Sequence, residues 1–204
     1  MTDTDHSLDD PLADALLSGS TYDRLRVQRF SYFKQTIPQK LVVQSGLLFT
    51  LAFVLPLAAG FPAETKALFA GHAPVVASPK ALLLGLVAAA IELGTAATLI
   101  VVTVARLRIG PEMTVETARR LLNVEDVATL LGFVTGGAAV LLTVGFFLLG
   151  YAGPDALASF VTAGGTSPYT PSGAGVSVAT LGLGALAGGL LVLGSSVGLN
   201  GLLD

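Results

Sequence analysis

The chain of 204 residues contains no cysteine, which excludes disulfides, thiolate metal sites and catalysis by a cysteine nucleophile. Charged residues are also scarce, at 12% of the chain, about half of the roughly 25% that soluble domains carry. Hydrophobic residues make up 52% of the chain, and the mean hydropathy is +0.76. This composition predicts a small helical membrane protein, although the length alone would allow one or two soluble domains.

Sequence patterns that would indicate catalysis or cofactor binding are not evident. The chain has no Gly-rich phosphate loop and no pair of carboxylates within one apolar stretch. His6 lies in an acidic tail, and His72 is near Glu64 in a loop without completing a metal motif. We therefore expect no catalytic residue, no metal, no cofactor and no enzymatic activity. Basic loop residues are explained by topology and lipid headgroups, so we expect no nucleic acid partner.

Four long apolar stretches are the main positive feature of the sequence. Each is long enough to cross a bilayer core, which needs about 20 helical residues. Leu, Ala and Gly dominate them, without the period-two alternation of a transmembrane barrel strand. The sequence therefore predicts an all-α integral membrane protein, a four-transmembrane-helix bundle within residues 39–204. The expected spans cover about residues 41–61, 81–104, 127–151 and 176–199.

The distribution of basic residues predicts the orientation. The first outer loop has Lys66 and Lys80, and the loop over residues 152–175 has no Lys or Arg. Because Lys and Arg collect in cytoplasmic loops, we expect both termini to be cytoplasmic in a multi-pass protein of the cell membrane. The basic residues before the first span and after the second are Arg24, Arg26, Arg29, Lys34 and Lys40, then Arg106, Arg108, Arg119 and Arg120.

Two segments are expected before the first span. Residues 1–20 form an acidic cytoplasmic tail with a short helix capped by Asp10 and Pro11, unlike the basic start of a signal peptide. The sequence predicts that residues 21–38 form a basic amphipathic helix on the inner membrane surface. The alternative is that this helix packs beneath the bundle or against a partner subunit. The residues expected to reach lipid headgroups are Arg24, Arg26, Arg29, Lys34 and Lys40.

Two connections have simpler interpretations. The segment over residues 106–126 predicts one short helix that starts at Thr114. Glu125 and Asp126 are then expected to open the third span, because a helix N-terminus favours negative charge. The Gly- and Pro-rich loop over residues 152–175 can be a partly ordered cap or a flexible linker.

Glu92 is the one formally charged residue within the four stretches. An ionisable group at such depth is costly and indicates a functional site by default. Its side of the helix carries small residues that allow another helix to approach, so Glu92 is expected to point into protein. The residues on that side are Gly85, Ala88, Ala89, Thr95, Ala96 and Leu99. The bulky opposite side, with Leu82 and Leu93, is expected to face lipid.

No Lys, Arg or His lies in the other expected spans. Burial without a counter-charge favours the neutral carboxyl group, so we expect Glu92 to be protonated for much of the time and to donate a hydrogen bond. Depth favours Thr50, Thr135 and Thr143 as partners, with Thr180 or a backbone carbonyl freed near Pro56 as further options. The other candidate partners are Gln44, Ser45, Ser195 and Asn200. Three interpretations stay open: a protonated Glu92 that ties helices together, a Glu92 that exchanges a proton or binds a cation, and a Glu92 completed by a partner subunit.

Glycines in the third and fourth spans favour close helix packing. Their spacing suits either contacts within one bundle or self-association, and the pair in the third span can receive another helix or act as a hinge. The residues are Gly136, Gly137, Gly184, Gly188, Gly194 and Gly198. We expect a non-enzymatic structural or accessory subunit of a membrane assembly or homo-oligomer. The alternative is a channel or secondary transporter with Glu92 as its proton or cation site.

Overall fold

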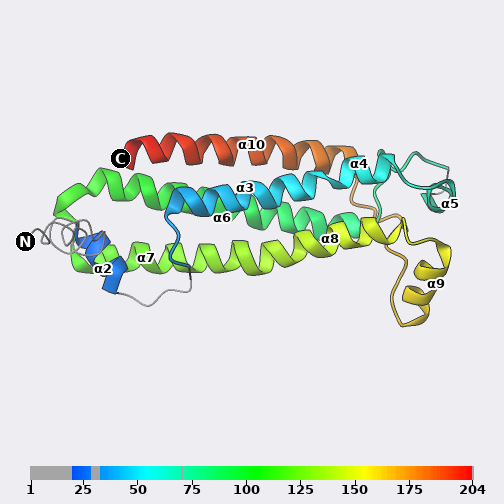
Figure 1. Ribbon diagram of the computed structural model, residues 1–204, viewed down its shortest axis with the longest axis horizontal. Helices are drawn as coiled ribbons and strands as arrows, with labels where there is room; N and C mark the ends of the chain where they lie inside the picture. The colour runs from blue at the N-terminus through cyan, green and yellow to red at the C-terminus, as the bar shows by residue number, and fades with distance from the viewer. Residues whose placement is uncertain (1–19, 29–32, 70, 204) are drawn as a thin grey trace, which may run out of the picture.

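Four long helical columns run side by side along the longest axis of the molecule (Figure 1). The computed structural model describes residues 20–28, 33–69 and 71–203. These residues form helices and loops. Within them, Pro79 and Pro171 form an isolated antiparallel β-bridge. In chain order the helices are α2 (Thr21–Gln28), α3 (Ile37–Ala52), α4 (Val54–Ala59), α5 (Ala63–Lys66), η1 (Ala67–Phe69), α6 (Ala81–Ile109), η2 (Gly110–Glu112), α7 (Val115–Leu130), η3 (Leu131–Gly136), α8 (Gly137–Leu149), α9 (Pro154–Thr162) and α10 (Val178–Leu203).

The four columns are long and apolar enough to cross a membrane, so the expected all-helical, four-span architecture is confirmed at that level. They cover Ile37–Ala59, Ala81–Ile109, Val115–Leu149 and Val178–Leu202. Helix α2 and the end of α10 lie at one end of the bundle, here called the terminal end (Figure 1). Helices α5 and α9 lie at the opposite, loop end.

The third column differs from the sequence prediction. We expected a short helix from Thr114 and a separate span from about residue 127, but α7, η3 and α8 are continuous from Val115 to Leu149. The Thr114 hydroxyl caps this helix by accepting from the Thr117 N–H. Residues 115–126 include neither Gly nor Pro, so nothing in them interrupts the helix. Glu125 consequently lies inside a helix and does not open one.

The first column begins earlier than expected. Thr36 and Gln39 form a reciprocal capping box, which fixes the start of α3 at Ile37. Lys40 is therefore inside the span and not in front of it. The column is interrupted at Phe53, between α3 and α4. Pro56 has no N–H to offer the carbonyl of Ala52, which explains a break at this position.

The segment before the first span is not a single helix. Helix α2 ends at Gln28, and residues 33–36 are not helical. Tyr22 is 1% exposed and packs with Met113, Ala118 and Leu122 at the start of the third column. Helix α2 thus packs against the bundle, as the alternative interpretation held. The expected acidic tail with its helix at Asp10 lies outside the described residues.

The loop end is covered by an ordered cap. The N–H of Lys80 donates to the Thr170 carbonyl at 2.8 Å, and the N–H of Ser172 donates to the Ser78 carbonyl at 2.7 Å. Tyr169 is 2% exposed. Its ring packs edge-on against Phe61 and tilted against Phe69, and its hydroxyl donates to the Phe146 carbonyl at 2.7 Å. Of the two interpretations of residues 152–175, the cap describes the structure.

Helix α10 packs along α3 through some of its glycines and leaves others open. A Cβ added at Gly189 would lie 2.7 Å from the Phe49 ring, and one at Gly188 would lie 2.9 Å from Leu93. Gly184, Gly194 and Gly198 have no atom within 4 Å of such a Cβ. The glycine pair of the third column does not receive α10: Gly136 faces α6, and Gly137 faces Leu47 of α3.

We expect Tyr169→Ala to destabilise the protein by about 3 kcal/mol or more, because it removes a buried aromatic ring from the cap. Tyr169→Phe keeps the ring and deletes one hydrogen bond, so it should cost only about 1 kcal/mol. Thermal unfolding in detergent measures both effects. Equal melting temperatures for the Ala variant and the parent protein would contradict the packing role of the cap.

Candidate functional site

Glu92 lies near the middle of α6 and is completely buried. Of the small residues predicted to share its face, Gly85 and Ala88 are buried as well, whereas Ala89 is half-buried. Leu93, expected to face outward, is 40% exposed. Leu82 was assigned to the same outward side, but it is fully buried and joins the core near the loop end. Near the loop end α10 also packs against the bundle. Helix α6 is therefore covered by protein on more than the one face that the sequence predicted to point inward.

The carboxyl group of Glu92 has no hydrogen-bond partner among the described residues, for either oxygen. The threonines proposed as its partners satisfy other groups or point elsewhere. Thr50 is exposed and donates to the Gly46 carbonyl at 2.9 Å. Thr143 is buried and donates to the Ala139 carbonyl at 2.7 Å. Thr135 is exposed on the far side of η3.

A π-helical turn, η3, lies against Glu92 and supplies two glycines to its surroundings. A Cβ on Gly136 would overlap Oε1 of Glu92. A Cβ on Gly132 would lie 2.6 Å from Nε2 of Gln44 and 2.9 Å from Oγ1 of Thr95. A side chain at either position would therefore require these polar groups to shift. Single π turns within α-helices occur frequently at functional sites.

Gln44 and Thr95 form a second polar contact, defined here as the Gln44–Thr95 pair. Nε2 of Gln44 donates to Oγ1 of Thr95 at 2.7 Å, and Thr95 in turn donates to the Ile91 carbonyl at 2.8 Å. Oε1 of Gln44 is buried without a partner among the described residues. Together with Glu92, the interior thus holds three acceptor oxygens that lack a donor. Buried acceptors of this kind normally bind water or an ion.

Chemically, this arrangement can bind a proton or a small cation. A carboxylate takes up a proton, and oxygen ligands of Glu, Gln and Thr suit hard cations. Within residues 20–28, 33–69 and 71–203, no group of three or more acidic or His side chains could hold a metal ion. A cation here would therefore depend on one carboxylate and neutral oxygens.

A second buried group lies nearer the terminal end and is called the terminal cluster: Tyr22, Lys40 and Glu125. Nζ of Lys40 lies 2.6 Å from Oε1 of Glu125, and the Tyr22 hydroxyl donates to Oε2. The three residues are 1%, 1% and 2% exposed. Burial raises the pKa of the Tyr22 phenol well above its ordinary value, and the Glu125 carboxylate raises this pKa further. Tyr22 consequently remains a hydrogen-bond donor.

The terminal cluster corrects two sequence predictions. Lys40 was expected to reach lipid headgroups, but it is buried in an ion pair. Glu125 was expected to complement a helix N-terminus, but it lies ten residues inside α7 and neutralises Lys40. Both errors have one origin, because α3 and α7 begin earlier than the apolar stretches. Sequence spacing alone gives no signal that pairs these two residues.

The other residues assigned to headgroups have varied surroundings. Arg24 and Lys34 are exposed, whereas Arg26 donates to the Lys34 and Gln35 carbonyls. Arg29 lies outside the described residues. Arg106, which the sequence assigned only to topology, donates to both carboxylate oxygens of Asp23 at 2.7 and 2.8 Å. Its guanidinium also lies 4.7 Å from the centre of the Tyr22 ring, so it helps to hold α2 in place.

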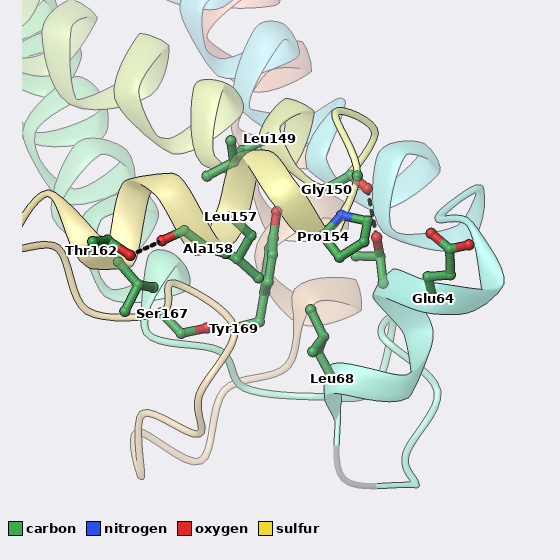
Figure 2. A pocket seen from close by; sticks show the side chains of 13 residues that line it. Glu64, Leu68, Leu149, Gly150, Pro154, Leu157, Ala158, Thr162, Ser167 and Tyr169 are labelled. Carbon is green, nitrogen blue, oxygen red and sulfur yellow. Dashed lines mark hydrogen bonds between the residues drawn. The ribbon is translucent and has the colours of Figure 1, made fainter.

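A pocket of about 440 Å³ at the loop end is mainly apolar (Figure 2). Leu68, Leu157 and Tyr169 project into it, and Glu64 lies at its edge. Its Thr65 hydroxyl already donates to the Gly150 carbonyl at 2.6 Å, one of the dashed bonds in Figure 2. The pocket therefore offers little polar chemistry compared with the surroundings of Glu92.

One short pattern resembles a nucleophile motif but lacks its geometry. Residues Gly194, Ser196 and Gly198 match the Gly-x-Ser-x-Gly spacing. In hydrolases this motif forms a sharp turn between a strand and a helix, which exposes the serine. Here it lies within α10, and Ser196 is 4% exposed. It does not form such a turn.

Comparisons with known proteins give no functional assignment. No family model, curated protein or solved structure matches the chain.

We expect Gly136→Ala to destabilise the protein by about 1–3 kcal/mol, because its methyl group would overlap the Glu92 carboxyl group. Gly137→Ala is the matched control: its Cβ would lie 3.6 Å from Leu47, an ordinary contact. Adding Glu92→Ala to Gly136→Ala should recover most of the loss. Thermal unfolding of the variants measures this coupling, and equal effects of the two glycine substitutions would contradict the placement of Glu92.

Proposed function

We propose that the protein is a small multi-pass channel or secondary transporter in which Glu92 binds a proton or a small cation. The observation that carries this proposal is the completely buried carboxyl group without a hydrogen-bond partner among the described residues. The adjacent π turn, which leaves space for that group through Gly136, supports it further. Ionisable groups within membrane spans typically mark ion or proton pathways.

The competing interpretation, a protonated Glu92 that ties helices together, requires an acceptor on a neighbouring helix. Neither oxygen of Glu92 is hydrogen-bonded to a threonine among the described residues. Thr50 and Thr135 are exposed, and the Thr143 hydroxyl is directed to the Ala139 carbonyl of its own helix. A buried carboxyl group that no other side chain satisfies fits a group that binds a proton or another ligand.

The proposed orientation has both termini in the cytoplasm of a cell-membrane protein. It is based on the excess of Lys and Arg in the segments at the terminal end. In this arrangement α2 lies at the cytoplasmic surface, with Arg24 exposed toward headgroups and Lys34 close by. Arg26 bonds the backbone at Lys34 and Gln35, so its role there is to shape the segment before α3.

Reconstitution into liposomes tests the role of Glu92. The protein alone should support proton or monovalent-cation flux down an imposed gradient, measured with an internal pH dye or an ion-sensitive dye. Glu92→Gln retains size and polarity but cannot titrate, so flux should fall by roughly tenfold or more. Glu112→Gln, at an exposed site in η2, is the control and should retain flux. Full flux in Glu92→Gln would refute the proposal.

A second candidate role is that of a structural or accessory subunit in a homo-oligomer or larger complex. Gly184, Gly194 and Gly198 of α10 favour it, because they are open on the outside of the bundle. Between membrane helices, small residues at this spacing permit close backbone approach. The neighbouring Leu191 and Val197 are also largely exposed, at 73% and 69%.

We expect Gly194→Leu combined with Gly198→Leu to shift an oligomer toward smaller species, because the added side chains block close helix contact. Gly46→Leu is the matched control, since Gly46 is equally open but lies on α3. Mass measurement of the intact protein in mild detergent separates the species. A single mass for all variants, equal to that of one chain, would remove this candidate role.

A further inference from the structure

Two sets of buried polar side chains, called here the two steps, lie one after the other between the terminal end of the bundle and Glu92. The first step is the terminal cluster of Tyr22, Lys40 and Glu125. The second is the Gln44–Thr95 pair, where Thr95 lies one turn from Glu92 on α6 and also approaches the Glu92 carbonyl at 3.2 Å. All of these side chains are at least nine-tenths buried.

Helix α3 and the third column both present residues of the two steps, in the same order from the terminal end toward Glu92. On α3, Lys40 and Gln44 are four residues apart, so they share a face about 6 Å apart along the axis. On the third column, Glu125 comes first, and Gly132, which touches Gln44, follows about two turns later. Between them is Thr129, completely buried, whose hydroxyl donates to the Glu125 carbonyl at 2.7 Å. The two steps therefore follow one line inside the bundle.

The interior beyond Glu92, toward the loop end, is different. Thr143 and Thr65 are the buried polar side chains there among the described residues, and both hydroxyls donate to nearby carbonyls. The rest of that core is apolar and is closed by the aromatic cap. Its largest members include Leu51, Leu82, Phe61, Phe147, Tyr169 and Leu181. Among the described residues, the buried polar side chains near Glu92 thus lie mainly on its terminal side.

The buried ion pair on this line favours a proton over a metal cation. Lys40 and Glu125 neutralise each other, and a metal cation would have to separate them in order to pass. A proton can instead pass between hydroxyl, carboxyl and water oxygens. Tyr22 suits such a transfer, because its hydroxyl already donates to Oε2 of Glu125.

We propose that Glu92 exchanges protons faster with the terminal side of the membrane than with the loop side, through the terminal cluster and the Gln44–Thr95 pair. This inference rests on the proposed function of Glu92 and adds the identity of its ligand and its side of access. The structure places the ion pair of Lys40 and Glu125 as the contact that disfavours metal cations, and Gln44 and Thr95 as residues that position the last proton donor.

A proton reaches Glu92 from one oxygen to the next, and in each step one O–H bond forms as another breaks. A hydronium ion at the terminal end protonates the Tyr22 oxygen while the phenolic proton passes to Oε2 of Glu125. The Glu125 O–H then breaks as a proton moves to a water held by Oε1 of Gln44, and that water gives one of its own protons to Glu92. Hydronium and carboxylate become water and carboxylic acid, while Tyr22 and Glu125 return to their starting forms.

Few other titratable groups face this line. Among the described residues, α2 adds Asp23 and Arg26, and α6 adds Arg106. Asp23 and Arg106 pair with each other, and the charge of Arg26 acts on Tyr22. The spans of α8 and α10 contain no Asp, Glu, His, Lys or Arg. A pH response of the interior therefore reports on Glu92 or on the terminal cluster.

The test follows protonation of Glu92 directly. The carboxylic acid C=O stretch, assigned by its loss in Glu92→Gln, is recorded by infrared spectroscopy in liposomes with one protein orientation. A pH step on the terminal side should change this band much faster than the same step on the loop side. Tyr22→Phe and the charge-balanced Lys40→Met with Glu125→Gln should slow the change by roughly tenfold. Asp155→Asn, exposed on α9, is the control that should leave the rate unchanged.

The possible outcomes separate this inference from the function on which it rests. A Glu92 band that never responds to pH on either side overturns the proposed function. A band that responds equally to both sides, or at the parental rate in both terminal-cluster variants, overturns the one-sided route and leaves the function of Glu92 standing. A band that moves with a Na⁺ or K⁺ step at constant pH overturns the assignment to protons.

Discussion

A polar side chain inside an apolar helical bundle can be satisfied only by another polar group of the protein or by a bound ligand. This constraint organises the molecule because the bundle contains two buried acids in opposite situations. Glu125 is neutralised by Lys40 and accepts the Tyr22 hydroxyl. Glu92 has no partner among the described residues. The first acid stabilises the packing of three helical segments, whereas the second leaves an unfilled bonding capacity in the core.

The buried ion pair explains why the terminal end has its observed form. Breaking such a pair by removing one partner typically costs about 3–5 kcal/mol, since it leaves one charge buried and alone. Lys40 and Glu125 therefore fix α3 against α7, and Tyr22 brings α2 to the same place. The contact between Asp23 and Arg106 then adds α6 to this arrangement. Helix α2 is held by charge and packing together, which a membrane-surface helix would not require.

Sequence reasoning predicted the fold class well and the charged contacts poorly, for a physical reason. Hydropathy locates spans because each must match the bilayer thickness, and all four were found. Hydropathy does not locate helix ends, since an N-cap such as Thr36 or Thr114 extends a helix into polar sequence. Lys40 and Glu125 lie in those extensions, 85 residues apart in the chain, and their pairing depends on tertiary packing. The inward direction of Glu92, which depends only on helical periodicity, was predicted correctly.

The partner of Glu92 was the part of the site that could not be predicted, and its surroundings explain why. Helical periodicity says which face a threonine occupies, but a threonine in a helix can always donate to the carbonyl one turn earlier. Thr50, Thr95 and Thr143 all do so. A threonine of suitable depth therefore need not turn its hydroxyl toward Glu92, and the π turn η3 presents Gly136 to the carboxyl group instead. A bundle that surrounds an acid with small residues and self-satisfied hydroxyls leaves that acid free to exchange a ligand, which is the property that proton or ion binding requires.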